Sequence, residues 1–129
     1  MTTTPLHVLY VDDDADIRTI VEMALGLDPG IDLRVARSGK HALEIVGGGE
    51  WRPDVVVLDV MMPAMDGPTT MSAMRSVEGL ETIPILFMTA RARDADLAEY
   101  HRMGAAGTIK KPFDPLQLAT EVRALAGPR

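Results

Sequence analysis

Short apolar runs alternate with longer segments of helical periodicity along this chain. The apolar runs are rich in Val, Ile and Leu, which favour β-strands. Between them, apolar residues recur three and four positions apart, which predicts amphipathic helices. The expected strands cover residues 6–11, 31–36, 55–58, 83–88 and 107–110. The expected helices cover residues 17–25, 42–46, 68–77, 94–104 and 115–126.

Turn-forming residues support these boundaries. Residues 28–30 are Asp-Pro-Gly and end the first helix, and three glycines at 47–49 end the second. Gly104 ends the fourth helix, and Pro115 is a suitable first residue for the fifth. The run at 55–58 is apolar at every position, which is typical of a central parallel strand covered on both faces.

Five strand–helix units in alternation predict an α/β fold, with a parallel sheet between two layers of helices. Crossovers between parallel strands are right-handed, and the usual five-stranded solution is the flavodoxin-like, doubly wound order 2-1-3-4-5. The length of 129 residues fits one domain, and no linker or repeat interrupts the pattern. We therefore expect a single domain over residues 1–129.

Composition and charge narrow the classes of function. Cysteine is absent, which excludes disulfides, a thiolate nucleophile and cysteine-ligated metals. The net charge of −6 disfavours nucleic acid as a partner. No apolar run approaches the roughly 20 residues of a membrane span, so we expect no membrane association and a cytoplasmic location.

Polar residues whose side chains can take part in catalysis or metal binding follow four of the expected strands. Asp12 and Asp13 follow the first strand, Asp59 the third, Thr89 the fourth and Lys111 the fifth. Sites in open α/β sheets form at these carboxyl ends, so the side chains are expected to converge. Clustered carboxylates need a cation, and an oxygen-only shell suits Mg²⁺. With a hydroxyl and an ammonium to hold anionic oxygens, the set indicates phosphoryl transfer.

Each of these residues also has an ordinary interpretation. An aspartate after a strand is usually a turn or helix-capping residue, which is the role expected of Asp14 or Asp16. A threonine at a strand end and a lysine in a loop are common features of any fold. Their joint placement at four strand ends is what favours a site.

The same residues carry a resemblance to a known family. The chain resembles the response-regulator receiver domains of bacterial two-component signalling, including single-domain chemotaxis regulators. The segments that match, in the order and spacing of that family, are residues 8–14, 57–63, 65–67, 88–90 and 109–113.

The resemblance implies a role for each acidic residue. Asp59 would be the phosphoacceptor, a carboxylate nucleophile that attacks a phosphohistidine or a small phosphodonor. Asp12, Asp13 and Asp59 would hold Mg²⁺, or Mn²⁺ in its place, together with the backbone carbonyl of Met61. Such a protein modifies itself and is not a turnover enzyme.

The resemblance also assigns the residues that would contact the phosphoryl group. Thr89 and Lys111 would each bind a phosphoryl oxygen, and a cis peptide bond before Pro112 would orient the lysine. Arg91 and Met61 would flank the group and affect the access of water.

One position departs from the family pattern. Receivers commonly carry Tyr or Phe three residues before the lysine of the Lys-Pro pair, where this chain has Thr108. A switch that couples Thr89 to a ring at that site is therefore excluded. We expect motion of the loop after Thr89 to carry the signal instead.

The partners implied by the resemblance are proteins. A sensor histidine kinase or a histidine phosphotransfer protein would dock near the first helix, where Ile17, Ile20 and Val21 are divided between core and contact. A downstream target would bind the face of helix 4, strand 5 and helix 5. Candidates on that face are Ala98, His101, Arg102 and residues 115–122. A merely solvated helical face explains these residues equally well.

Three alternative interpretations compete with this resemblance. An acyl-phosphate enzyme of the haloacid dehalogenase type needs a second aspartate where this chain has Met61, and a calcium loop from Asp12 fails because Ile17 and Met23 occupy positions that need Gly and Glu. A phosphorylation-independent module of the same fold, acting only by binding, remains open.

Overall fold

The computed structural model describes residues 4–128 and contains one five-stranded parallel sheet in the order β2-β1-β3-β4-β5, as the alternating pattern predicts. The strands are β1 (Leu6–Val11), β2 (Ile31–Ala36), β3 (Val55–Asp59), β4 (Ile85–Thr89) and β5 (Gly107–Lys110). The helices are α1 (Ala15–Gly26), α2 (Gly39–Gly47), α3 (Gly67–Met74), α4 (Asp94–Met103) and α5 (Leu118–Ala126).

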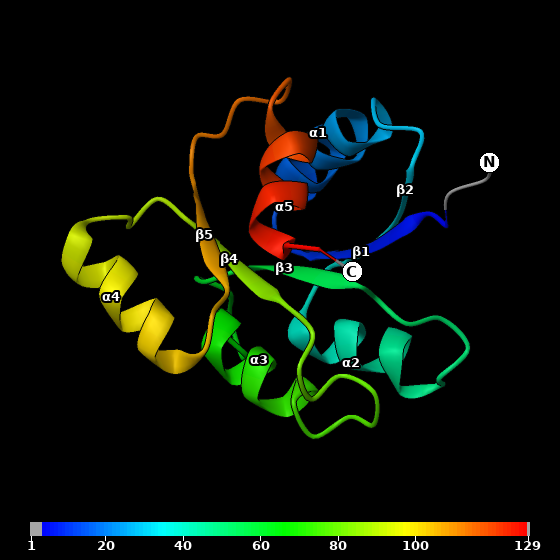
Figure 1. Ribbon diagram of the computed structural model, residues 1–129. Coiled ribbons are helices and arrows are strands. Elements are labelled where there is room, and N and C mark those ends of the chain that lie inside the picture. The colour runs from blue at the N-terminus through cyan, green and yellow to red at the C-terminus, as the bar shows by residue number, and fades with distance from the viewer. Residues whose placement is uncertain (1–3, 129) are drawn as a thin grey trace.

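Helices cover both faces of the sheet. Figure 1 shows α1 and α5 on one face and α2, α3 and α4 on the other. The side chains of each strand alternate between the two cores because successive residues point to opposite faces. Val55 and Val57 pack toward α1 and α5, whereas Val56 and Leu58 pack toward α2 and α3. Every residue of β3 and β4 is buried, so these strands lie at the centre of the core.

Several element boundaries differ from the prediction by one to three residues, and three of these differences can be followed in local hydrogen bonds. The fourth strand begins at Ile85 instead of 83, because Pro84 has no N–H and contributes only its carbonyl, which accepts from the Val56 amide at 3.1 Å. The third helix ends at Met74 instead of Val77, in a turn where the Val77 amide donates to the Met74 carbonyl.

The third difference is the start of the last helix. It begins at Leu118 and not near Pro115. The Asp114 carboxylate accepts from the amide of Leu116, and its carbonyl accepts from the amide of Gln117. These bonds form a turn that delays the helix by three residues.

Helix caps follow the sequence more closely. Asp14 is the N-cap of α1, and its carboxylate accepts from the amides of Asp16 and Ile17. Gly104 ends α4 with a positive φ of 109°, a conformation that glycine adopts without strain. Within residues 4–128, no helix has the length and apolar character needed to traverse a membrane.

Candidate functional site

Four strand ends meet at one rim of the sheet. Asp12 follows β1, Asp59 is the last residue of β3, and Thr89 is the last residue of β4. In the parallel register Asp59 pairs with Met88, which places Thr89 one residue beyond it, and Lys111 follows β5 directly. The fold therefore brings together the side chains that the sequence analysis singled out.

Three carboxylates form the floor of this site. One oxygen from each of Asp12, Asp13 and Asp59 lies within 4.8 Å of the others. Asp12 is fully buried, Asp59 is 5% exposed and Asp13 is open to solvent. Three converging carboxylate oxygens with one solvent-facing side match the oxygen-rich, partly hydrated shell of Mg²⁺. These residues fit a divalent cation.

Lys111 is the basic group of the site. Its Nζ atom lies 3.2 Å from Oδ1 of Asp59 and 3.5 Å from Oδ2 of Asp12. One ammonium facing three ionised carboxylates leaves an excess of two negative charges. A divalent cation would balance that excess.

The same crowding acts on Asp59. Burial and, after it, the nearby Asp12 carboxylate raise the pKa of Asp59, while Lys111 lowers it, and together these effects bring the pKa to about 6. The carboxylate is thus disfavoured in the metal-free protein, yet it is mostly ionised at neutral pH. An ionised carboxylate is what a nucleophilic role needs.

Thr89 has a buried hydroxyl that can act as a hydrogen-bond donor. Its Oγ1 accepts from the Arg91 amide at 2.9 Å, and this bond leaves the hydroxyl hydrogen available to donate to a ligand oxygen. Thr108, opposite Phe87 in the β4–β5 register, is half-buried. The Lys111–Pro112 peptide bond is cis, and the side chains of Met61 and Arg91 are exposed.

The β1–α1 connection holds Asp12 from several directions. Its Oδ1 accepts from the Asp14 amide at 2.9 Å, and its Oδ2 accepts from the Tyr10 hydroxyl at 2.6 Å. Its backbone carbonyl accepts from Nη1 of Arg18 at 2.7 Å. Sequence reasoning missed Tyr10 and Arg18. The alternation of β-strand side chains puts Tyr10 on the same face as Asp12, and that spacing could have identified it.

A glycine keeps the β3–α3 connection close to Asp59. A Cβ atom at Gly67 would lie 2.9 Å from both the Asp59 carbonyl oxygen and the Cα of Val60. The Gly67 amide donates to the Val60 carbonyl at 2.9 Å. Because the nearest atoms are backbone, no side-chain movement would make room for a larger residue.

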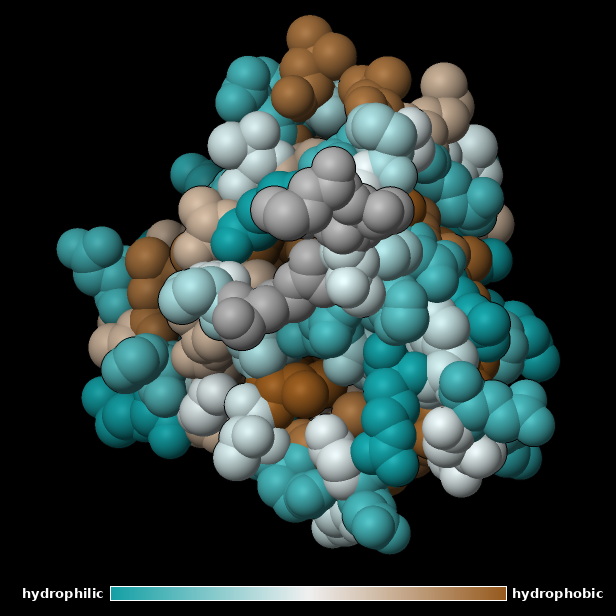
Figure 2. Space-filling view, turned by 45° about the vertical axis from the view of Figure 1, so that its right-hand side comes forward, coloured by the Kyte–Doolittle hydropathy of each residue, from teal (hydrophilic) through white to brown (hydrophobic). Residues whose placement is uncertain are grey.

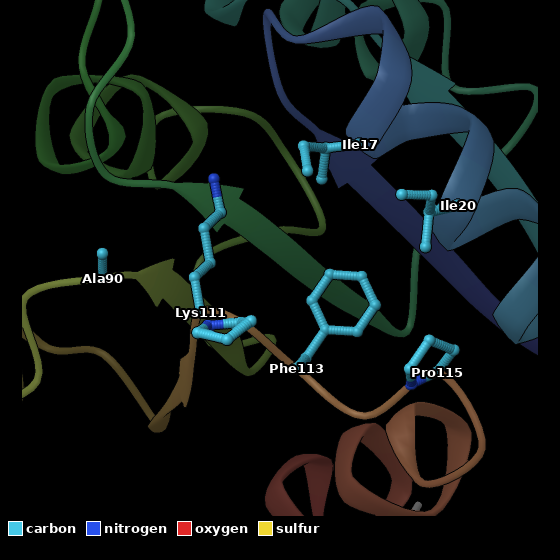
Figure 3. A pocket seen from close by; sticks show the side chains of 7 residues that line it. Ile17, Ile20, Ala90, Lys111, Phe113 and Pro115 are labelled. Atoms are coloured by element: carbon cyan, nitrogen blue, oxygen red, sulfur yellow. The ribbon is translucent and has the colours of Figure 1, made fainter.

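An apolar groove borders the site. Figure 3 shows Lys111 and Phe113 on one side of it and Ile17 and Ile20 of α1 on the other, with Ala90 and Pro115 at its ends. Its volume is about 350 Å³. Of the three α1 residues divided between core and contact, Val21 is buried, Ile17 is half-buried and Ile20 is 41% exposed.

The apolar surface continues along α1. A second hollow of about 310 Å³ lies between α1 and the connection before α5, and it is lined by Ile20, Met23, Ala24, Leu27, Pro115 and Leu116. Figure 2 shows hydrophobic surface at the top of the molecule, where Figure 1 places these two elements. Met23, Leu27 and Leu116 are each at least 64% exposed.

Comparison with known proteins places this geometry in a family. The family model described as the response regulator receiver domain matches residues 8–123. The chain belongs to this family. Receiver domains are signalling proteins of two-component systems, and they bind Mg²⁺ at an acidic pocket.

Individual relatives agree with the assignment. The chain is 36% identical over 121 residues to the response regulator MprA of Mycolicibacterium vanbaalenii, covering 94% of this chain and 50% of MprA. It is 36% identical over 124 residues to the DNA-binding response regulator MtrA of Mycobacterium bovis, covering 96% of this chain and 52% of MtrA. The chain therefore spans about half the length of the curated relatives it matches.

A solved structure matches along its whole length. The chemotaxis protein CheY4 of Vibrio cholerae superposes with a TM-score of 0.84 at 32% identity, covering 95% of this chain and 99% of CheY4. The family and the strand order predicted from the sequence are thus confirmed.

Proposed function

We propose that this receiver domain accepts a phosphoryl group on Asp59 from a histidine kinase or a histidine phosphotransfer protein, with Mg²⁺ bound, and signals through a changed affinity for another protein. The observation that carries the proposal is the position of the Asp59 carboxylate. It lies at the rim, next to the carboxylates of Asp12 and Asp13 and 3.2 Å from Nζ of Lys111.

The chemistry uses the groups already described. A carboxylate oxygen of Asp59 forms a bond to phosphorus as the P–N bond of a donor phosphohistidine breaks, and the imidazole nitrogen retains the electron pair and takes up a proton. Asp12, Asp13 and Asp59 would hold Mg²⁺ with the Met61 carbonyl, and the bound ion would neutralise charge on the phosphoryl oxygens. Lys111 and the Thr89 hydroxyl would hold two of those oxygens.

The groove beside α1 supports a protein donor. Lys111 lines the groove and also contacts Asp59, so a macromolecule that delivers a phosphoryl group to Asp59 has this apolar surface beside its path. Exposed Ile20, Met23 and Leu27 on one helix face match the apolar contact patch of a protein partner. A small phosphodonor would not need them.

The loop after β4 supports a route for the output. The Tyr100 hydroxyl of α4 donates to the Arg91 carbonyl at 3.3 Å, and the Arg91 amide donates to Oγ1 of Thr89. The Tyr100 ring also packs edge-on against Phe87 of β4. A movement of Thr89 toward a phosphoryl group would thus reach α4 without an aromatic ring at Thr108.

The target surface on α4, β5 and α5 belongs to the same proposal. Ala98, His101 and Arg102 are exposed on α4, as a contact with another protein requires. Within residues 115–122, Leu118 and Val122 are buried in the core and contribute to packing instead.

A binding module that is never phosphorylated is the second candidate, and Thr108 is the observation that favours it. The two candidates differ in their response to beryllofluoride, which mimics a phosphoryl group on an aspartate. With Mg²⁺ present, beryllofluoride should raise the Tm of the wild type and leave that of Asp59→Asn unchanged. An unchanged wild-type Tm would favour the module.

A further inference from the structure

We infer that Tyr10 is a positioning residue for the Mg²⁺ ligand Asp12, and that its hydroxyl sets the affinity of the acidic site for the cation. This inference rests on the proposed function, because it concerns the same metal site.

The contact is short and completely enclosed. Tyr10 and Asp12 are both 0% exposed, and the hydroxyl donates to Oδ2 of Asp12 at 2.6 Å. Burial, followed by the hydrogen bond to Asp12, raises the pKa of Tyr10 far above its ordinary value. The phenol therefore remains a neutral donor, and Asp12 is the acceptor.

A hydroxyl is unexpected at this position. Tyr10 points into the core beneath α1 and α5, where its buried neighbours are apolar side chains such as Val21, Leu86 and Ile109. A phenylalanine would fill the same space. Within residues 4–128, the only other polar contact of the hydroxyl is the Met88 sulfur at 3.3 Å, which is a weak acceptor. The bond to Asp12 is what the oxygen adds.

The bond completes the immobilisation of the Asp12 carboxylate. Oδ1 is held by the Asp14 amide and Oδ2 by Tyr10, so the plane of the carboxylate is fixed before any cation arrives. Without the phenol, Oδ2 would keep its contact with Lys111, at 3.5 Å. The carboxylate could then rotate toward Lys111 and draw it away from Asp59. Groups that orient metal ligands in this way typically change metal affinity by about 10- to 100-fold when removed.

The test is calorimetric titration of the unphosphorylated protein with Mg²⁺. Tyr10→Phe should weaken Mg²⁺ binding by about 10-fold or more. Met88→Leu is the matched control, because it removes the other contact of the same hydroxyl and leaves the Tyr10–Asp12 bond in place. Its Mg²⁺ affinity should equal that of the wild type. Tyr10→Met, which also lacks the hydroxyl but packs differently, repeats the measurement should the Phe variant fail to fold.

A double-mutant cycle separates positioning from a general loss of structure. In the Asp12→Ala background, Tyr10→Phe should change the affinity for Mg²⁺ no further. Equal Mg²⁺ affinity in wild type and Tyr10→Phe would overturn the inference, as would an undiminished effect in the Asp12→Ala background. A wild type that binds no Mg²⁺ would instead contradict the proposed function, so the two failures are distinguishable.

Discussion

At the rim, carboxylates of like charge lie close together, which is electrostatically unfavourable. Asp59 is buried next to Asp12, and within residues 4–128 Lys111 is the one basic side chain that forms ion pairs with these two carboxylates. Such an arrangement costs stability in the metal-free protein, and it is retained where a cation or an anion is to be bound. The rim therefore has an excess of negative charge, which a bound cation would neutralise.

This imbalance predicts how Asp59 affects folding. Its pKa is about 6 in the folded protein against an ordinary value of 3.8, so the folded state binds more protons than the unfolded state between these two pH values. The wild type therefore loses stability as pH rises from about 4 to about 6, and the full cost of about 3 kcal/mol is present above that range. In EDTA at pH 7.5, Asp59→Asn should raise the free energy of unfolding by about that amount.

Urea unfolding at pH 7.5 and pH 4 measures this effect. The difference between the two proteins should shrink at the lower pH, and added Mg²⁺ should reduce it at the higher pH by stabilising the wild type. A wild type at least as stable as Asp59→Asn in EDTA at pH 7.5 would show that the rim carries no such cost.

Most residues of the site could be predicted because they follow strands. Asp12, Asp59, Thr89 and Lys111 come at strand ends, which a parallel sheet gathers at one edge whatever their distance in sequence. Tyr10 and Tyr100 escaped notice because each looks like an ordinary core aromatic. Strand alternation places Tyr10 on the same face as Asp12, but the direction of each hydroxyl depends on tertiary packing, which a pattern of apolar positions does not show.

At the scale of elements, the connections after β3 and β4 position the site. The strands and most helix ends follow local rules, whereas Pro84 and Asp114 moved two boundaries through hydrogen bonds to neighbours. Apolar periodicity does not register such bonds. The turns at the rim have the same character, since they depend on close backbone contacts.

The β3–α3 connection gives a direct test of such a contact. Gly67→Ala should destabilise the protein by about 1–3 kcal/mol, because the added Cβ would lie 2.9 Å from the backbone of Asp59 and Val60. Gly26→Ala at the end of α1 is the control, since nothing lies within 4 Å of its Cβ position, and it should be neutral or slightly stabilising. Thermal unfolding of the two variants compares them. Equal Tm values would refute the close contact.

The β4–α4 connection gives a second test of such a contact. Tyr100→Phe keeps the ring against Phe87 and removes the hydrogen bond to the Arg91 carbonyl, at a cost of about 1 kcal/mol or less. In this variant, the amide chemical shifts of α4 should respond less to beryllofluoride than in the wild type. His101→Ala, an exposed change on the same helix, should leave the response intact. An undiminished response in Tyr100→Phe would remove this tie from the route of the signal.

At the scale of the whole molecule, the sheet separates two surfaces around one rim. The apolar groove along α1 lies on one side of the sheet, and α4 lies on the other (Figure 1). The sequence predicted the layers, the strand order and the rim. It did not predict the groove, because Ile20, Met23 and Leu27 have the spacing of core residues, yet all three are exposed and line the hollow between α1 and the connection before α5.

This separation predicts that a substitution in the apolar groove along α1 weakens binding of the phosphodonor protein without changing the reactivity of Asp59. Ile20→Glu should slow phosphotransfer by at least about 10-fold from any phosphohistidine protein that labels the wild type, because it places a charge in an apolar contact. Phosphorylation by acetyl phosphate should be unchanged. Met103→Glu, on exposed α4, is the control and should affect neither reaction. Equal losses with both donors would mean that Ile20 acts on the site itself.

The most direct measurement of the central claim is the intact mass of the protein after incubation with acetyl phosphate and Mg²⁺. The account predicts one added phosphoryl group on the wild type. This adduct should not form when EDTA removes Mg²⁺ from the incubation, and it should not form on Asp59→Ala. An adduct that persists in Asp59→Ala, or no adduct on a folded wild type that also fails to bind beryllofluoride, would contradict it.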